Sequence, residues 1–275
     1  MWHYTLYDNS ISEIRTYFLL SRSKMSVIIL IIIGAVCGIL INYLSDVLPI
    51  YRKPGKPLCS NCAKPYSLYN YLISFKCKNC GERVSVRTII VLILSITASV
   101  ILWSFPFQNL SFWWTLPALV FLGVILVIDI EYRVVLIQTS IFGLGLLFLL
   151  GLVNQGFSID GILTTIAGGV AGFVIMIGLY YFGILFSKIM SKLRKQEIEE
   201  IALGFGDVYV STFLGLLIGW PSIISAIILA VLISGGFSIL YLAILSIQKK
   251  YQSFSAIPYT PFLIIGAVLI TYLLN

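Results

Sequence analysis

The sequence predicts an all-α polytopic membrane protein with about eight transmembrane helices. Hydrophobic side chains make up 59% of its 275 residues and charged ones only 11%, whereas a soluble domain carries about 25% charged residues. The mean hydropathy of +1.02 agrees with a membrane setting. Because the only histidine is His3, near the N-terminus, sites built on several histidines are disfavoured.

Eight apolar runs define the predicted helices. A helix needs about 17 to 25 apolar residues to cross a bilayer, because the lipid cannot satisfy backbone polar groups. The runs are Ser26–Tyr43, Thr88–Phe105, Phe112–Ile128, Val135–Val153, Gly161–Phe186, Val208–Trp220, Ser222–Ile247 and Pro258–Leu274. The sixth run is shorter than the others.

Basic residues set the predicted topology. The segment between the first two runs carries eight Lys or Arg residues and two acids, Asp46 and Glu82, so we place it in the cytoplasm. Eight spans then bring Arg133, Lys188–Lys195 and Lys249–Lys250 to the same side, while the opposite loops carry no basic residue. We therefore expect a multi-pass protein of the cytoplasmic (inner) membrane. We attribute the net charge of +7 to the basic cytoplasmic loops of such a protein and not to a nucleic-acid-binding surface.

The cytoplasmic loop contains two C-x-x-C pairs: Cys59 with Cys62, and Cys77 with Cys80. This spacing is typical of a zinc ribbon, in which four thiolates hold one tetrahedral ion. Disulfides are the alternative, but a reducing cytoplasm disfavours them. Four thiolates leave no open coordination position, so we predict a structural Zn²⁺ that folds a small zinc-ribbon-like loop.

These features divide the chain into four predicted parts. Residues 1–25 are an N-terminal lead, either an interfacial amphipathic segment or disordered, with no cleavable signal peptide. Residues 26–44 are the first transmembrane helix, residues 45–87 the cytoplasmic four-cysteine loop, and residues 88–275 the remaining transmembrane domain.

Two acids stand at the cytoplasmic ends of apolar runs. Asp129 closes the third run, and Asp207 opens the sixth, after Gly204 and Gly206. Each alone fits a helix end or an N-cap. Together they can face each other at one depth, where two carboxylates share a proton as in an aspartyl protease. The two glycines would let an extended substrate backbone lie against the loop.

With these motifs in place, the chain resembles the type IV prepilin peptidases, which are membrane-embedded G-x-G-D aspartyl proteases, often bifunctional with an N-methyltransferase. The likeness covers most of the chain. The motifs are Gly38–Asn42 with Leu48-Pro49, the cysteine loop with Asn70, Ser74 and Arg87, Asp129-Ile130-Glu131, Gly204–Val208, and Ile257–Phe262 with Gly266.

The resemblance implies that Asp129 and Asp207 are catalytic. It also implies a prepilin or pseudopilin substrate, whose short basic leader is cut from an apolar helix at the cytoplasmic membrane face. Glu131 and Glu200 are predicted to attract that leader, beside Gly204 and Gly206 as substrate-binding residues. A merely solvated acidic face is the alternative for the Glu197–Glu200 group. The basic cysteine loop better matches anionic lipid headgroups.

The chain departs from the family pattern at three positions. Leu136 stands in place of the family's usual proline, Tyr209 in place of a lysine and Leu92 in place of an acid. Many family members also methylate the new N-terminus from S-adenosylmethionine through the N-terminal cytoplasmic region, and the sequence leaves open whether this chain does. An inactive membrane scaffold that retains the fold is the alternative to a peptidase; a proton-relay transporter would place its acids nearer the midplane of the bilayer.

Overall fold

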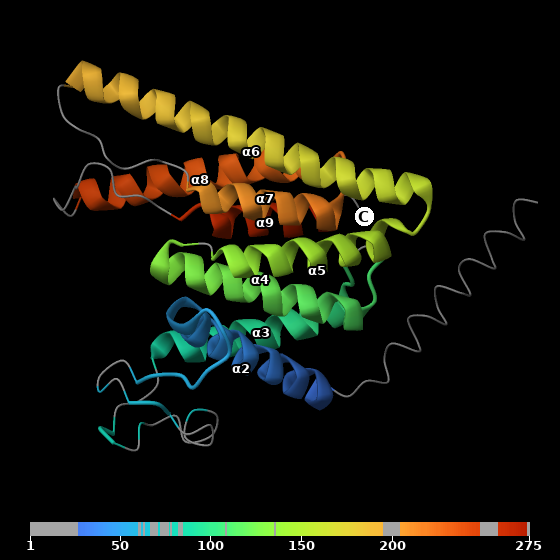
Figure 1. Ribbon diagram of the computed structural model, residues 1–275, viewed down its shortest axis with the longest axis vertical. Coiled ribbons are helices and arrows are strands. Elements are labelled where there is room, and N and C mark those ends of the chain that lie inside the picture. The colour runs from blue at the N-terminus through green and yellow to red at the C-terminus, as the bar shows by residue number, and fades with distance from the viewer. Residues whose placement is uncertain are drawn as a thin grey trace, which may run out of the picture.

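In the computed structural model of the chain, every regular secondary-structure element of the described residues is a helix (Figure 1). The structure describes residues 27–59, 62, 64–66, 71, 77, 79–81, 85–107, 109–134, 136–194, 204–247 and 258–273. The helices in these residues are α2 (Val27–Tyr51), α3 (Val86–Ser104), α4 (Phe112–Tyr132), α5 (Ile137–Gln155), α6 (Ile159–Arg194), α7 (Phe205–Ile218), α8 (Ser222–Ile247) and α9 (Thr260–Leu273). The predicted all-α fold is confirmed, whereas the predicted lead 1–25 lies outside the described residues.

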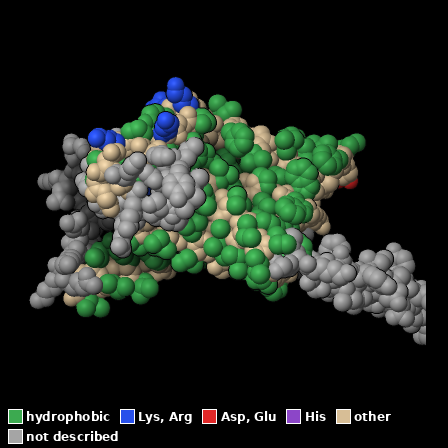
Figure 2. Space-filling model, turned by 90° about the horizontal axis from the view of Figure 1, so that it is seen from below, with side chains coloured by type: hydrophobic (Ala, Val, Ile, Leu, Met, Phe, Trp, Pro, Cys, Tyr) green, Lys and Arg blue, Asp and Glu red, His purple; other side chains and the backbone are tan. Residues whose placement is uncertain are grey.

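Six of these helices, namely α2 to α6 and α8, are long and apolar enough to cross a membrane. Large apolar side chains cover their outer faces, as at Ile28, Ile137 and Ile239. In Figure 2, hydrophobic side chains spread over the visible face, and Lys and Arg gather at one end. The chain is therefore a multi-pass membrane protein, since a soluble fold would bury such side chains.

Helices α7 and α9 are apolar but shorter, with 14 residues each. At 1.5 Å per residue each covers about 21 Å, less than the hydrocarbon thickness of about 30 Å. Helix α7 packs against α5, α6, α8 and α9. Its Val208, Val210 and Phe213 side chains are fully buried. Other helices thus shield α7 from lipid, so the ends of α7 can lie within the hydrocarbon region of the membrane.

Close backbone approach fixes α7 against α6. Gly168 and Gly215 face each other, and a Cβ built on Gly215 would lie 2.2 Å from the Gly168 carbonyl oxygen. One turn away, the buried Ser211 hydroxyl donates to the Gly172 carbonyl oxygen at 3.0 Å. Small side chains and interhelical hydrogen bonds are the usual means of helix association in lipid. The start of α7 is therefore held at a defined position.

A small cluster of buried apolar side chains joins α2, α3 and α4. Its members are Ile41, Val91, Val124, Val127 and Ile128. Figure 1 shows that the end of α2, which leads into the four-cysteine loop, lies at the same end of the bundle as the end of α4 and the start of α7. The segments that carry the predicted site residues therefore share one end of the molecule.

Two helices run past the bounds that hydropathy predicts. Helix α2 continues through Asp46 and Pro49 to Tyr51, beyond the predicted end at residue 44. Helix α6 reaches Arg194, beyond Phe186, and its Lys188 and Lys192 side chains are exposed. A hydropathy window ends where charges begin, but the backbone stays helical where polar side chains find solvent or an ion-pair partner.

Candidate active site and metal site

The G-x-G-D segment forms the start of α7. Gly204 is the N-cap residue, and Asp207 occupies the third helical position, from which its carboxyl reaches back to the backbone of the N-cap residue. The Gly204 backbone N–H donates to Asp207 Oδ2 at 3.1 Å. A Cβ built on Gly204 would meet only the Asp207 carboxyl, at 3.7 Å, and the Gly206 nitrogen, at 3.9 Å. The helix start therefore both orients Asp207 and leaves room for a backbone beside it.

Thr260 joins α9 to this carboxyl. It is the first residue of α9 and is fully buried, and its hydroxyl donates to Asp207 Oδ1 at 2.9 Å. Both oxygens of Asp207 thus accept a hydrogen bond, one from each of two helix starts. A buried carboxyl needs such partners, because leaving it without a hydrogen bond destabilises the fold by about 1–3 kcal/mol or more.

Asp129 lies in the last turn of α4 and is 8% exposed. The helix ends there because Arg133 adopts the left-handed conformation, with φ 52°, and its N–H donates to the Asp129 carbonyl oxygen at 2.9 Å. The Asp129 side chain interacts with Thr260, and its charge acts on Asp207. The structure therefore brings the two predicted aspartates together around one threonine hydroxyl.

Two buried polar atoms of this site have no hydrogen-bond partner within the described residues. One is Asp129 Oδ2, an acceptor, and the other is the Tyr259 hydroxyl, a donor. Tyr259 directly precedes Thr260, and its hydroxyl lies within reach of the Asp207 charge. The site therefore retains one acceptor and one donor that a bound peptide or water can satisfy.

The other predicted substrate-binding residues have different settings. Gly206 lies inside the first turn of α7, between Gly204 and Asp207. Glu131 forms an ion pair with Arg87, whose Nη1 donates to Glu131 Oε2 at 2.6 Å, and this pairing reduces the charge that a basic leader would meet. Glu200 lies outside the described residues.

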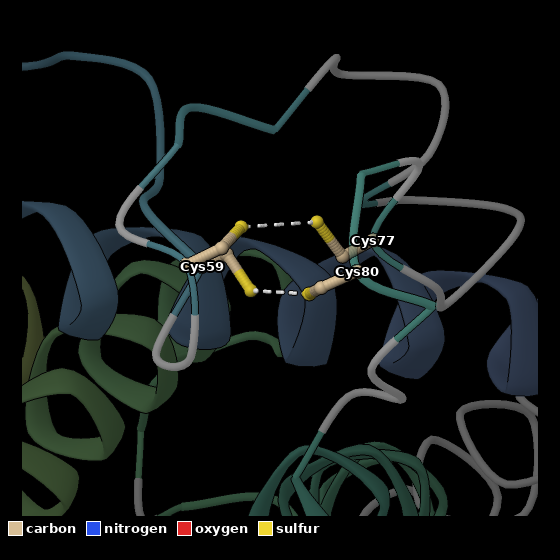
Figure 3. Close-up of side chains that lie close together, drawn as sticks. Cys59, Cys77 and Cys80 are labelled. Atoms are coloured by element: carbon tan, nitrogen blue, oxygen red, sulfur yellow. Dashed lines mark hydrogen bonds between the residues drawn. The ribbon is translucent and has the colours of Figure 1, made fainter.

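The four cysteines converge as their spacing predicts. Cys59 Sγ lies 3.6 Å from Cys80 Sγ, and Cys62 Sγ lies 3.7 Å from Cys77 Sγ. Figure 3 shows the sulfur atoms of Cys59, Cys77 and Cys80 turned toward one another. These distances exceed a disulfide bond of about 2.05 Å, whereas zinc with four sulfurs at about 2.3 Å separates them by about 3.8 Å. All four ligand atoms lie within 4.8 Å of one another, so the set fits one metal ion.

The surroundings of the thiols favour metal binding. Backbone N–H groups of Cys80 and Asn79 lower the pKa of the Cys77 thiol, which favours the thiolate that a metal requires. The Tyr66 hydroxyl forms a hydrogen bond with Cys59. Tyr66 and Tyr71 pack edge to face against each other, with ring centroids 5.7 Å apart, and form one buried cluster with Cys59 and Cys77. The loop thus surrounds its thiols with oriented donors and two aromatic rings.

Comparison with known families finds one match within the transmembrane part of the chain. Residues 116–239 match the sequence model of the type IV leader peptidase family. This match supports an assignment to this family for the matched segment. The matched segment begins in α4 and ends in α8, so it contains both Asp129 and Asp207. Neither a curated protein nor a solved structure gives a significant match to the chain.

Sequence reasoning assigned no role to Thr260 and Tyr259, although both stand in the motif Ile257–Phe262 near the C-terminus of the chain. The available signal was a threonine at the start of an apolar run, directly after Pro258-Tyr259. It also assigned no partner to Asp46 or Arg87, because ion pairs between distant helices leave no pattern of spacing in the sequence.

Proposed function

We propose that the chain is an aspartic endopeptidase that removes the short basic leader from type IV prepilin-like proteins at the cytoplasmic membrane face. The leader peptidase family indicates an aspartyl peptidase of the G-x-G-D type acting on a protein substrate in a membrane. The observation that carries the proposal is the meeting of Asp129 and Asp207 around Thr260.

The two aspartates would act as a pair that shares one proton. The ionised carboxylate takes a proton from water, the water oxygen attacks the scissile carbonyl carbon, and the other carboxyl gives its proton to the carbonyl oxygen. When the tetrahedral intermediate collapses, the C–N bond breaks and the amine leaves with a proton from the pair. Because Gly204 and Thr260 already bond to Asp207, Asp129 Oδ2 is the oxygen with capacity to accept from water.

Tyr259 would supply a further donor during this step. Its buried hydroxyl lies within the electrostatic reach of Asp207 and has no partner within the described residues. A donor that gains its partner only when negative charge develops on the carbonyl oxygen stabilises the transition state more than the bound substrate. We assign Tyr259 this role in the proposed reaction.

The end of the molecule that carries Asp129 and Asp207, the proposed catalytic dyad, suits a substrate with a basic leader and an apolar helix. The helix can approach through the lipid. Glu200, together with the part of the Glu131 charge that Arg87 leaves uncompensated, would attract the leader from the cytoplasm. The four-cysteine loop would hold Zn²⁺ through Cys59, Cys62, Cys77 and Cys80, and the ion would cross-link the loop without taking part in hydrolysis. Methylation from S-adenosylmethionine would be a second activity of the N-terminal region.

The substrate proposal is tested with purified protein in lipid and a prepilin-like substrate. The matched control substrate has the Lys and Arg residues of its leader replaced by Gln. Mass spectrometry should find cleavage after the glycine that precedes the apolar helix, with a higher KM for the neutral leader. An intact basic substrate in the presence of well-folded protein, over several pilin-like leaders, would instead favour the inactive scaffold.

A further inference from the structure

Four polar side chains connect the four-cysteine loop to the end of α4. The Tyr71 hydroxyl donates to Asp46 Oδ2. Asp46 Oδ1 accepts from Arg87 Nη2 at 2.5 Å, and Arg87 Nη1 donates to Glu131 Oε2 at 2.6 Å. The chain of contacts therefore runs from the loop through α2 and α3 to the last turn of α4.

On the loop side, this chain of contacts is attached to the predicted metal ligands. Tyr71 is 6% exposed and belongs to one buried cluster with Cys59, Cys77 and Tyr66. Its ring packs against Tyr66, whose hydroxyl contacts Cys59. Because the described residues of the loop bury only this small cluster, the position of Tyr71 depends on whether the thiols are held together.

On the side of α4, the chain of contacts ends close to Asp129. Glu131 follows Asp129 by two residues, in the turn that Arg133 closes. Arg87 is the one cation that bridges Asp46 and Glu131 in the described residues, and its side chain is 21% exposed. An isolated surface ion pair contributes little, but an arginine that links two carboxylates from different helices restricts how these helices can shift.

We propose that Arg87 is a positioning residue, and that metal in the four-cysteine loop sets the position of Asp129 through Tyr71, Asp46, Arg87 and Glu131. This inference rests on the proposed peptidase function. With metal bound, Tyr71 holds Asp46, and Arg87 then fixes the last turn of α4. Without metal, Tyr71 leaves Asp46, and the turn that carries Asp129 becomes looser.

The test uses the full-length protein and the variants Tyr71→Phe and Glu131→Gln. Tyr71→Phe removes one hydroxyl and keeps the ring against the cysteines. Tyr43→Phe is the matched control, because Tyr43 also packs on the cysteine cluster but donates to the Gly55 carbonyl oxygen, outside the chain of contacts. Zinc content is measured for each, and all three variants should retain the metal.

Hydrogen–deuterium exchange without substrate is the first readout. Chelation of zinc should speed amide exchange over residues 129–133 in wild type and in Tyr43→Phe. In Tyr71→Phe exchange there should already be fast, and chelation should add little. Unchanged exchange over these residues in wild type that has lost its zinc would overturn the proposal, whether or not the protein is a peptidase.

Kinetics give the second readout. Losing one hydrogen bond is expected to lower kcat by about threefold to tenfold in Tyr71→Phe. The kcat of the double variant Tyr71→Phe with Glu131→Gln should fall little further, because both substitutions interrupt the same chain of side-chain contacts. Fully additive losses would contradict the coupling, while the separate Asp129 and Asp207 variants would still decide the peptidase function.

Discussion

The dyad and the four-cysteine loop hold their functional side chains in different ways. Asp207 is oriented by the backbone of its own helix start and by the hydroxyl of a neighbouring helix, within a densely packed apolar core. The thiols are presented by a loop whose buried cluster consists of two cysteines and two tyrosines, with one further tyrosine and cysteine packed against it. The first arrangement depends on helix packing, whereas the second should depend on a bound ion.

The largest effect is expected where the helix packing itself is broken. Gly215→Ala places a Cβ 2.2 Å from the Gly168 carbonyl oxygen, so α6 and α7 must move apart. We expect a destabilisation of about 3 kcal/mol or more, since overpacking against backbone is poorly relieved. Thermal unfolding in detergent measures it.

Gly178→Ala is the matched control, because a Cβ at this position of α6 meets nothing within 4 Å. It should be neutral or stabilising by up to about 1 kcal/mol. Equal losses for the two variants would show that the contact between α6 and α7 does not decide stability.

Metal removal should affect the loop and leave the transmembrane helices folded. After chelation, proteolysis should cut between residues 59 and 80, while far-UV circular dichroism falls only slightly, since the ion supports a small loop. Cooperative loss of the whole helical signal on chelation would contradict the distinction between the two regions.

Within the dyad, Thr260→Val removes the donor to Asp207 and keeps the shape of the side chain. A hydrogen bond to a charged group contributes about 1.5–3 kcal/mol, so kcat should fall by about tenfold to a hundredfold. Thr260→Ser should restore most of the rate.

The control is Thr271→Val in the same helix, since the buried Thr271 hydroxyl donates to the Ala267 carbonyl oxygen away from the aspartates. Its kcat should match wild type. A Thr260→Val protein with undiminished kcat would remove Thr260 from the site.

The smallest effect is expected for Tyr259→Phe, which deletes the donor proposed for the intermediate. We expect kcat to fall by about threefold to tenfold with KM unchanged, because the hydroxyl would find its partner only in the transition state. Steady-state kinetics separate the two constants. A raised KM with unchanged kcat would make Tyr259 a substrate-binding residue instead.

Much of this architecture could be read from the sequence, because hydropathy and charge act locally. Asp129, Asp207 and the four cysteines stand at positions where an apolar run ends or a C-x-x-C pair recurs, and the structure brings each set together. The contacts of Thr260 and Arg87 could not be predicted in the same way. They join helices that lie 40 or more residues apart, and their register depends on how those helices pack.

The central claim is most directly tested by cleavage of a prepilin-like substrate with wild type beside Asp129→Asn and Asp207→Asn. Asparagine keeps the size of each side chain but cannot take up the proton. The account predicts that wild type cleaves and that both variants lose cleavage while remaining folded and keeping their zinc. Cleavage that persists in either folded variant would contradict a two-aspartate peptidase.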